Sequence, residues 1–159
     1  EDEREKRFRT LFNDHLDVPA IGKFVAGRYW RSTNEQDRSD FLVVFEDVMV
    51  QRFLPIFAEN SDLRLMFGSY RKHEKHEGMF VVNSILPRDG AEDVRVSWIV
   101  RYGKSDPKVL DILVEGTSMA LTLRSEYSSF LKKNGKKLAN LTASLREKVN
   151  AGAFQAKLN

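Results

Sequence analysis

The stretch KVLDILVEGTSMALTLRSEYSSFL, Lys108–Leu131, decides the fold because it begins as a strand and ends as a helix. Residues 109–114 are β-favouring or bulky apolar residues with only Asp111 interrupting, so both faces of the strand are expected to be buried. Gly116 then permits a sharp turn that a side chain would resist. The sequence therefore predicts a strand, a tight turn and a helix in direct succession.

The helix after this turn has a start signal and a stop signal. The hydroxyl of Thr117 or Ser118 can accept a hydrogen bond from a free backbone N–H of the first turn. Asn134-Gly135 is a typical helix end. Between them a single apolar stripe is formed by Met119, Leu123, Tyr127, Phe130 and Leu131.

Three further helices are predicted upstream. Residues 1–16 form the first, and the second runs from about residue 18 to 26 with Asp17 as its cap. The third runs from Glu35 to about Glu59, and its apolar surface is too broad to be covered by one partner. Pro55 should kink this helix or end it early, because it lacks a backbone N–H and crowds the preceding turn.

Short turns join the strands that follow, which predicts an antiparallel meander. The strands lie near residues 63–68, 79–86, 94–102 and 108–114, and a last helix spans residues 138–149. We therefore expect an α+β fold in which helices pack on one face of a curved four-stranded antiparallel sheet, with an apolar cavity between. Residues 1–150 are expected to form a single domain, and residues 151–159 a frayed tail.

The composition is that of a globular domain with much apolar surface. Of 159 residues, 42% are hydrophobic and eleven are Phe, which suits either a cavity or a filled core. The formal net charge of +3 comes from interleaved cations and anions, which argues against a nucleic-acid partner. Cysteine is absent, as an oxidising compartment would favour, and no apolar run approaches the ~18 residues of a membrane span.

No catalytic motif is found, so we expect neither an enzyme nor a cofactor. The chain contains no phosphate-binding Gly-rich loop and no zinc-protease motif. His73 and His76 lie in a charged turn, where a solvated loop is favoured over a metal site. Ser118 is interpreted as a helix cap, and Asp111 is the one candidate acid or base that an enzyme could use.

The turn after the last strand is expected to be fixed by structural residues. Glu115 and Arg124 could form an ion pair across it, and Gly116 supplies the turn itself. A cluster of lysines around Asn134-Gly135 is interpreted as a solvated helix end, with docking onto an acidic surface as the minority alternative.

Two segments resemble one known family. The first has an Asp in the last strand, then Glu-Gly-x-Ser, then an Arg and an aromatic residue; the second is a Gly-Arg-Tyr-Trp run. Together they resemble the phospholipid-binding MlaC/toluene-tolerance family through Asp111, Glu115, Gly116, Ser118, Arg124, Tyr127 and residues 27–30. The chain departs from the family where Pro107-Lys108 replaces the usual Trp-Lys pair.

The resemblance implies a function as a lipid carrier. Members of this family are periplasmic proteins that exchange phospholipid between an outer-membrane lipoprotein complex and the lipid-binding subunit of an inner-membrane ABC transporter. The resemblance thus implies bound phospholipid, a periplasmic location with the signal peptide removed, and a monomer. A relative linked to hopanoid biosynthesis has a similar pattern, so the lipid could differ.

The residues expected to contact lipid are apolar ones on the helices and strands. They are Phe24, Val25, Tyr29, Trp30, Phe45, Val48, Met49, Phe53, Phe57, Val81, Val96, Trp98, Val100 and Leu113. Two alternatives remain open: a small isomerase-like enzyme in a cone-shaped α+β fold, and an interaction module with a filled core. Phospholipid that copurifies with the protein would separate the three.

Overall fold

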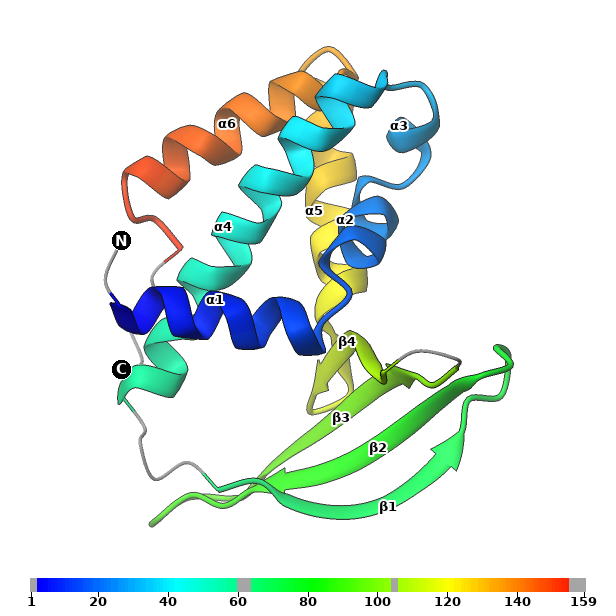
Figure 1. The fold of residues 1–159 in the computed structure, drawn as a ribbon, viewed down its shortest axis with the longest axis vertical. Helices are drawn as coiled ribbons and strands as arrows, with labels where there is room; N and C mark the ends of the chain where they lie inside the picture. The colour runs from blue at the N-terminus through cyan, green and yellow to red at the C-terminus, as the bar shows by residue number, and fades with distance from the viewer. Residues whose placement is uncertain (1–2, 60–63, 104–105, 155–159) are drawn as a thin grey trace.

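The computed structural model describes residues 3–59, 64–103 and 106–154, and it consists of a helical layer and an antiparallel sheet (Figure 1). The helices within these residues are α1 (Glu3–His15), α2 (Val18–Ala26), α3 (Arg28–Arg31), α4 (Glu35–Glu59), α5 (Met119–Lys133) and α6 (Leu138–Asn150). The strands are β1 (Met66–Lys72), β2 (Met79–Leu86), β3 (Val94–Arg101), β4 (Lys108–Val114) and β5 (Thr117–Ser118). Within the described ranges, no helix is both long enough and apolar enough to cross a membrane.

Side chains cap the starts of two helices, one at the predicted residue Asp17 and one at Asn34. The Asp17 side chain accepts a hydrogen bond from the Ala20 backbone N–H at 3.0 Å, and Asn34 accepts one from Asp37 N–H at 2.8 Å. The sequence prediction missed α3, a single turn. The prediction of an early end to α4 is wrong, because the helix continues through Pro55 to Glu59.

The helices share one core, and α4 runs through its middle. The side chains of Phe41, Phe45, Val48 and Met49 are fully buried in it. The ring of Tyr127 on α5 packs edge-on against those of Phe41 and Phe45, with centroids 6.3 and 6.4 Å away. Helices α1, α2 and α6, together with Tyr127 of α5, thus cover the broad apolar surface of α4 that the sequence showed.

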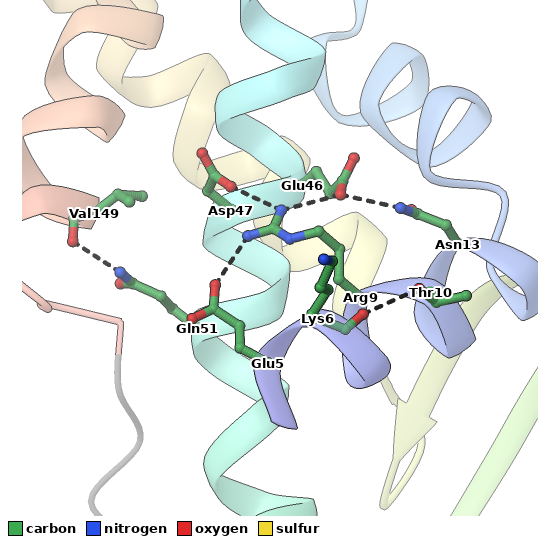
Figure 2. Close-up of polar contacts among 9 residues, drawn as sticks. All are labelled: Glu5, Lys6, Arg9, Thr10, Asn13, Glu46, Asp47, Gln51 and Val149. Atoms are coloured by element: carbon green, nitrogen blue, oxygen red, sulfur yellow. Dashed lines mark hydrogen bonds and ion pairs between the residues drawn. The ribbon is translucent and has the colours of Figure 1, made fainter. Parts of the chain in front are cut away.

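A polar cluster holds α1 across α4 (Figure 2). The Arg9 guanidinium bonds to the carboxylates of Glu46 at 3.0 Å and Asp47 at 2.8 Å on α4, and to Glu5 at 3.1 Å on its own helix. Partial burial lowers the pKa of Arg9, but the bonds to these three carboxylates outweigh it and raise that pKa overall. Asn13 adds a further bond to Glu46, so the crossing is fixed at two points of α1.

The sheet is an antiparallel meander of β1 to β5 in chain order. It has one strand more than the four predicted, because the chain turns back tightly after β4. Glu115 and Gly116 at the turn have φ angles of 49° and 79°, and Val114 and Leu113 then pair with Thr117 and Ser118. The remaining strands pair as the predicted meander requires.

The helical layer meets the sheet chiefly along β4 (Figure 1). The Asp17 N–H donates to the Val109 carbonyl at 3.0 Å, which adds the start of α2 to the edge of β4. The Lys108 ammonium donates to the carbonyl of Asn13 at 3.0 Å, at the carboxyl end of α1, and the Arg101 guanidinium pairs with Asp17.

The start of the predicted tail is ordered. Residues 151–154 form turns that continue from α6. Phe154 packs against the helical core, with the Arg52 guanidinium 5.3 Å from its ring centroid. The frayed tail over residues 151–159 stays a prediction, because residues 155–159 lie outside the described part of the chain.

Candidate functional site

Strand register divides the predicted lipid-contacting residues of the sheet between two opposite faces. Trp98 pairs with Val82, and Val96 pairs with Ser84, so these side chains and that of Val100 share one face. Val81 is directly opposite Ile99, and Leu113 is opposite Ser97 in β3, so both belong to the other face. A single face of the sheet therefore cannot hold all of the predicted lipid-contacting residues.

The first of these surfaces, which we call the apolar sheet face, is almost wholly aromatic and aliphatic. A chain of edge-on rings crosses it, because Phe80 lies 6.4 Å from both Tyr70 and Tyr102. Tyr70 is 73% exposed and Phe67 is 66% exposed. Its members by strand register include Phe67, Tyr70, Phe80, Val82, Val96, Trp98, Val100 and Ile112, with the polar residues Lys72 and Ser84 beside them.

Trp98 is fixed in the middle of the apolar sheet face. Its indole N–H donates to the Ser84 hydroxyl at 2.9 Å, and that hydroxyl donates to the Val96 carbonyl at 3.0 Å. The one polar side chain beneath the ring is therefore satisfied within the sheet. The middle of the face therefore presents the ring surface of Trp98 to a ligand.

The opposite face of the same strands is polar at its centre. The Asn83 side chain accepts a hydrogen bond from Ser97 at 2.9 Å and donates one to Ser69 at 3.3 Å. Arg95 on this face binds Glu115 at 2.8 Å. This contrast identifies the apolar sheet face as the candidate ligand surface.

The predicted helical contacts lie elsewhere. Phe45, Val48 and Met49 are packed in the helical core, and Phe53 lies against it. Trp30 is half-buried beneath the Arg38 guanidinium, 5.3 Å from its ring centroid. Phe57 belongs to the last turn of α4, and its side chain lies outside the described part of the structure. In this structure the helical part of the predicted cavity wall is filled by protein side chains.

Asp111, the polar residue within β4, caps helix α5. Its carboxylate accepts hydrogen bonds from the Ser118 hydroxyl at 2.5 Å, the Ala120 N–H at 2.9 Å and the Ile112 N–H at 2.8 Å. The Ser118 oxygen in turn accepts from the Leu121 N–H at 3.0 Å, as a cap should. The strand, the turn and the helix are thus tied together by one half-buried carboxylate.

The predicted ion pair between Glu115 and Arg124 is wrong. Glu115 binds Arg95 on the neighbouring strand β3 instead, because the tight turn keeps it in the plane of the sheet. The Arg95 backbone N–H, with the guanidinium, lowers the pKa of Glu115. The Arg124 guanidinium stacks on the ring of Phe24, 4.7 Å from its centroid.

Sequence reasoning also missed a cavity of about 160 Å³ where the end of α2 and α3 approach α5. Val25 and Tyr29 line it, as do the cationic side chains of Arg28, Arg124 and Lys132. The spacing of Arg124 and Lys132, eight residues apart on one helix face, was a signal that could have indicated it. Elsewhere in the described ranges, no three His, Asp or Glu residues gather as a metal site would require.

A family model described as "MlaC protein" matches residues 1–147. The chain belongs to the MlaC family. The family resemblance noted in the sequence is thus confirmed, and both of its segments lie within the matched residues. No curated protein matches this chain.

The fold is also similar to that of a solved structure, the phospholipid-binding protein from Ralstonia solanacearum in complex with a phospholipid. The two superpose with a TM-score of 0.78 at 18% sequence identity, over 89% of this chain and 78% of the other. The predicted α+β fold class is therefore confirmed, with the short strand β5 added.

The two segments that carry the MlaC resemblance meet at α2 and α5. Gly27 ends α2 with a φ of 59°, and a Cβ at this position would lie 3.4 Å from Nε of Arg124. The Gly27 backbone and the Arg124 guanidinium therefore lie close together. Gly27, which precedes the aromatic pair, and Arg124, on the helix that follows the last strand, thus belong to one structural unit.

Proposed function

We propose that this chain is a phospholipid-binding carrier and not an enzyme. The observation that carries the proposal is the apolar sheet face, where Phe67, Tyr70 and Phe80 present ring surface. Acyl chains need only such a surface, because their binding is driven by burial of apolar area. The apolar sheet face of this chain is where we place them.

Membership of the MlaC family supports this proposal, as does the likeness of the fold to a protein that has been crystallised with phospholipid. By the same resemblance we propose a periplasmic monomer. It would pass lipid between an outer-membrane lipoprotein complex and the lipid-binding subunit of an inner-membrane ABC transporter. No nucleic acid and no cofactor enters this function.

Energetics favour a carrier with few specific contacts. Burying roughly 30 methylenes of two acyl chains stabilises a lipid by about 24 kcal/mol relative to water, at about 0.8 kcal/mol for each. The bilayer provides the same stabilisation, so the protein needs only to match it. An apolar face without strong head-group ligands meets this requirement and still allows release.

The structure weighs against the isomerase-like alternative. Such an enzyme needs a free acid or base at its ligand surface. Asp111 was the one candidate, and its carboxylate is engaged by three donors that fix the start of α5. A carrier of hopanoid lipids remains the second candidate, since an apolar face accepts either lipid.

The test is the lipid content of the protein after purification without detergent. We expect phospholipid near one molecule per chain, measured by phosphorus assay and by mass spectrometry of a chloroform extract. A terpenoid lipid in the extract would favour the hopanoid alternative. Protein with no lipid, and with unchanged stability after organic extraction, would contradict a carrier.

A pair of variants on β2 tests the choice of face. Val82→Lys places a charge on the apolar sheet face and should lower bound phosphorus at least severalfold, because burying a charge against acyl chains is costly. Ile85→Lys is the control, since Ile85 is an exposed aliphatic residue on the opposite face of the same strand. Loss of lipid in the control alone would mean that the wrong face has been chosen.

A further inference from the structure

The cavity at α2, α3 and α5 is surrounded by positive charge. Arg28 comes from α3, and Arg124 and Lys132 come from one face of α5, about two turns apart. Ser128 lies between the two α5 cations and adds a hydroxyl to the lining. The side chains that line the cavity include no carboxylate.

None of the three cations is neutralised by a carboxylate among the side chains that the structure describes. The Arg124 guanidinium lies over the ring of Phe24, and the Arg28 guanidinium lies 5.0 Å from the ring centroid of Tyr29. Stacking on a ring leaves the N–H groups at the guanidinium edge free to donate. The site therefore holds three like charges with unused donors.

The pKa of the Tyr29 hydroxyl is affected by the positive potential of this site. Arg28 donates to it at 3.1 Å, and this bond, with the charges of Arg28 and Lys132, lowers the pKa of Tyr29. Gly27, whose backbone lies close to the Arg124 guanidinium, lines the same cavity. The positions of the cations and their effect on the Tyr29 pKa thus both indicate a positively charged site at this cavity.

We propose that this cavity binds a phosphate group through Arg28, Arg124 and Lys132. Guanidinium forks match the oxygen spacing of phosphate, and a compact ammonium adds a third charge-assisted donor. Three donors that converge from two helices around a small cavity suit a tetrahedral oxyanion. The group belongs either to free inorganic phosphate or to the head group of an anionic lipid at a membrane surface.

This site is separate from the apolar sheet face. Helix α3 and the carboxyl-terminal half of α5 lie at the end of the helical layer away from β1, β2 and β3 (Figure 1). A phosphate bound by Arg28 and Lys132 therefore lies on the helical layer and not on the apolar sheet face. The inference stands whether or not the proposed carrier function is correct.

The experiment titrates the whole protein with inorganic phosphate at constant ionic strength, by calorimetry and by the shift in melting temperature. We expect saturable binding to the unaltered chain. Lys132→Gln should raise the Kd by about tenfold, since one charge-assisted donor is lost. Lys133→Gln is the matched control: it removes the same charge one residue away, outside the cavity lining, and should leave the Kd unchanged.

A second arm identifies the source of the phosphate. Flotation with phosphatidylcholine vesicles, with and without phosphatidylglycerol, is compared for Lys132→Gln and Lys133→Gln. Binding to the anionic vesicles that is lost only in Lys132→Gln assigns the site to lipid head groups, and phosphate binding without vesicle binding assigns it to free phosphate. Non-saturable titrations, or equal effects of the two variants in both arms, would mean screening of surface charge and would overturn the proposal.

Discussion

Asp111 shows how a single polar residue within an apolar strand can be structural. Its carboxylate accepts from Ser118, Ala120 and Ile112, so Asp111→Ala leaves two backbone donors and one hydroxyl without their acceptor. We expect a loss of about 2 kcal/mol in the free energy of unfolding, measured by urea denaturation. Asp111→Asn keeps one acceptor oxygen and should cost less; equal losses would mean that the charge, not the cap, matters.

Glu115 gives the stability a dependence on pH. Its folded-state pKa is lowered by the Arg95 N–H and guanidinium, so the carboxylate stabilises the fold above its ordinary pKa. That stabilisation is lost as the pH falls through the lowered, folded-state value. Glu115→Gln should therefore lose less stability on acidification than the unaltered chain, as followed by urea melts across the acidic range. Parallel curves would show that the pair does not persist in solution.

Tyr127 is buried in the helical core, and its hydroxyl has no hydrogen-bond partner among the described residues. Burial also raises its pKa, because the phenolate would be desolvated. Tyr127→Phe removes the unsatisfied group and keeps the ring contacts, so stability should rise by about 1 kcal/mol in chemical denaturation. A decrease would mean that the hydroxyl is satisfied in solution.

At the scale of elements, α4 shows why a broad apolar surface does not by itself predict a ligand cavity. Val48 is fully buried in the helical core, so Val48→Trp should overpack it and cost about 1–3 kcal/mol in thermal or chemical unfolding. Val43→Trp, at an exposed position on the same helix, is the control and should be nearly neutral. If the Val48→Trp protein kept full stability and bound less lipid, the result would support the predicted cavity beside α4.

At the scale of the whole molecule, the two layers differ in how firmly they are held. Strand β1 is exposed along its length and pairs only with β2, whereas α4 and α5 lie in the common core. Hydrogen exchange should therefore be fastest in β1 and slowest in the buried turns of α4 and α5, read residue by residue by NMR. Equal protection in β1 and α5 would mean that the molecule opens as one unit.

Much of this architecture was determined by local sequence signals. Asp17 and Asn34 mark helix starts by capping, which depends only on the next three residues. Alternation in residues 94–102 indicated a strand with two unlike faces, and the short turns required a meander. The motif around Asp111 and Ser118 was sufficient to indicate the family, because residues close in sequence make the bonds that hold it.

Only the tertiary structure decided which surfaces meet. From the sequence, Glu115 could pair with either Arg95 or Arg124, and the strand register places it beside Arg95. The packing of α2 on α5 places Arg124 against Phe24 and Gly27 instead. Periodicity shows that a face is apolar but not what covers it, since protein side chains and lipid chains satisfy the pattern equally. The covering of α4 by other helices and the open apolar sheet face therefore follow from long-range packing, which sequence spacing does not encode.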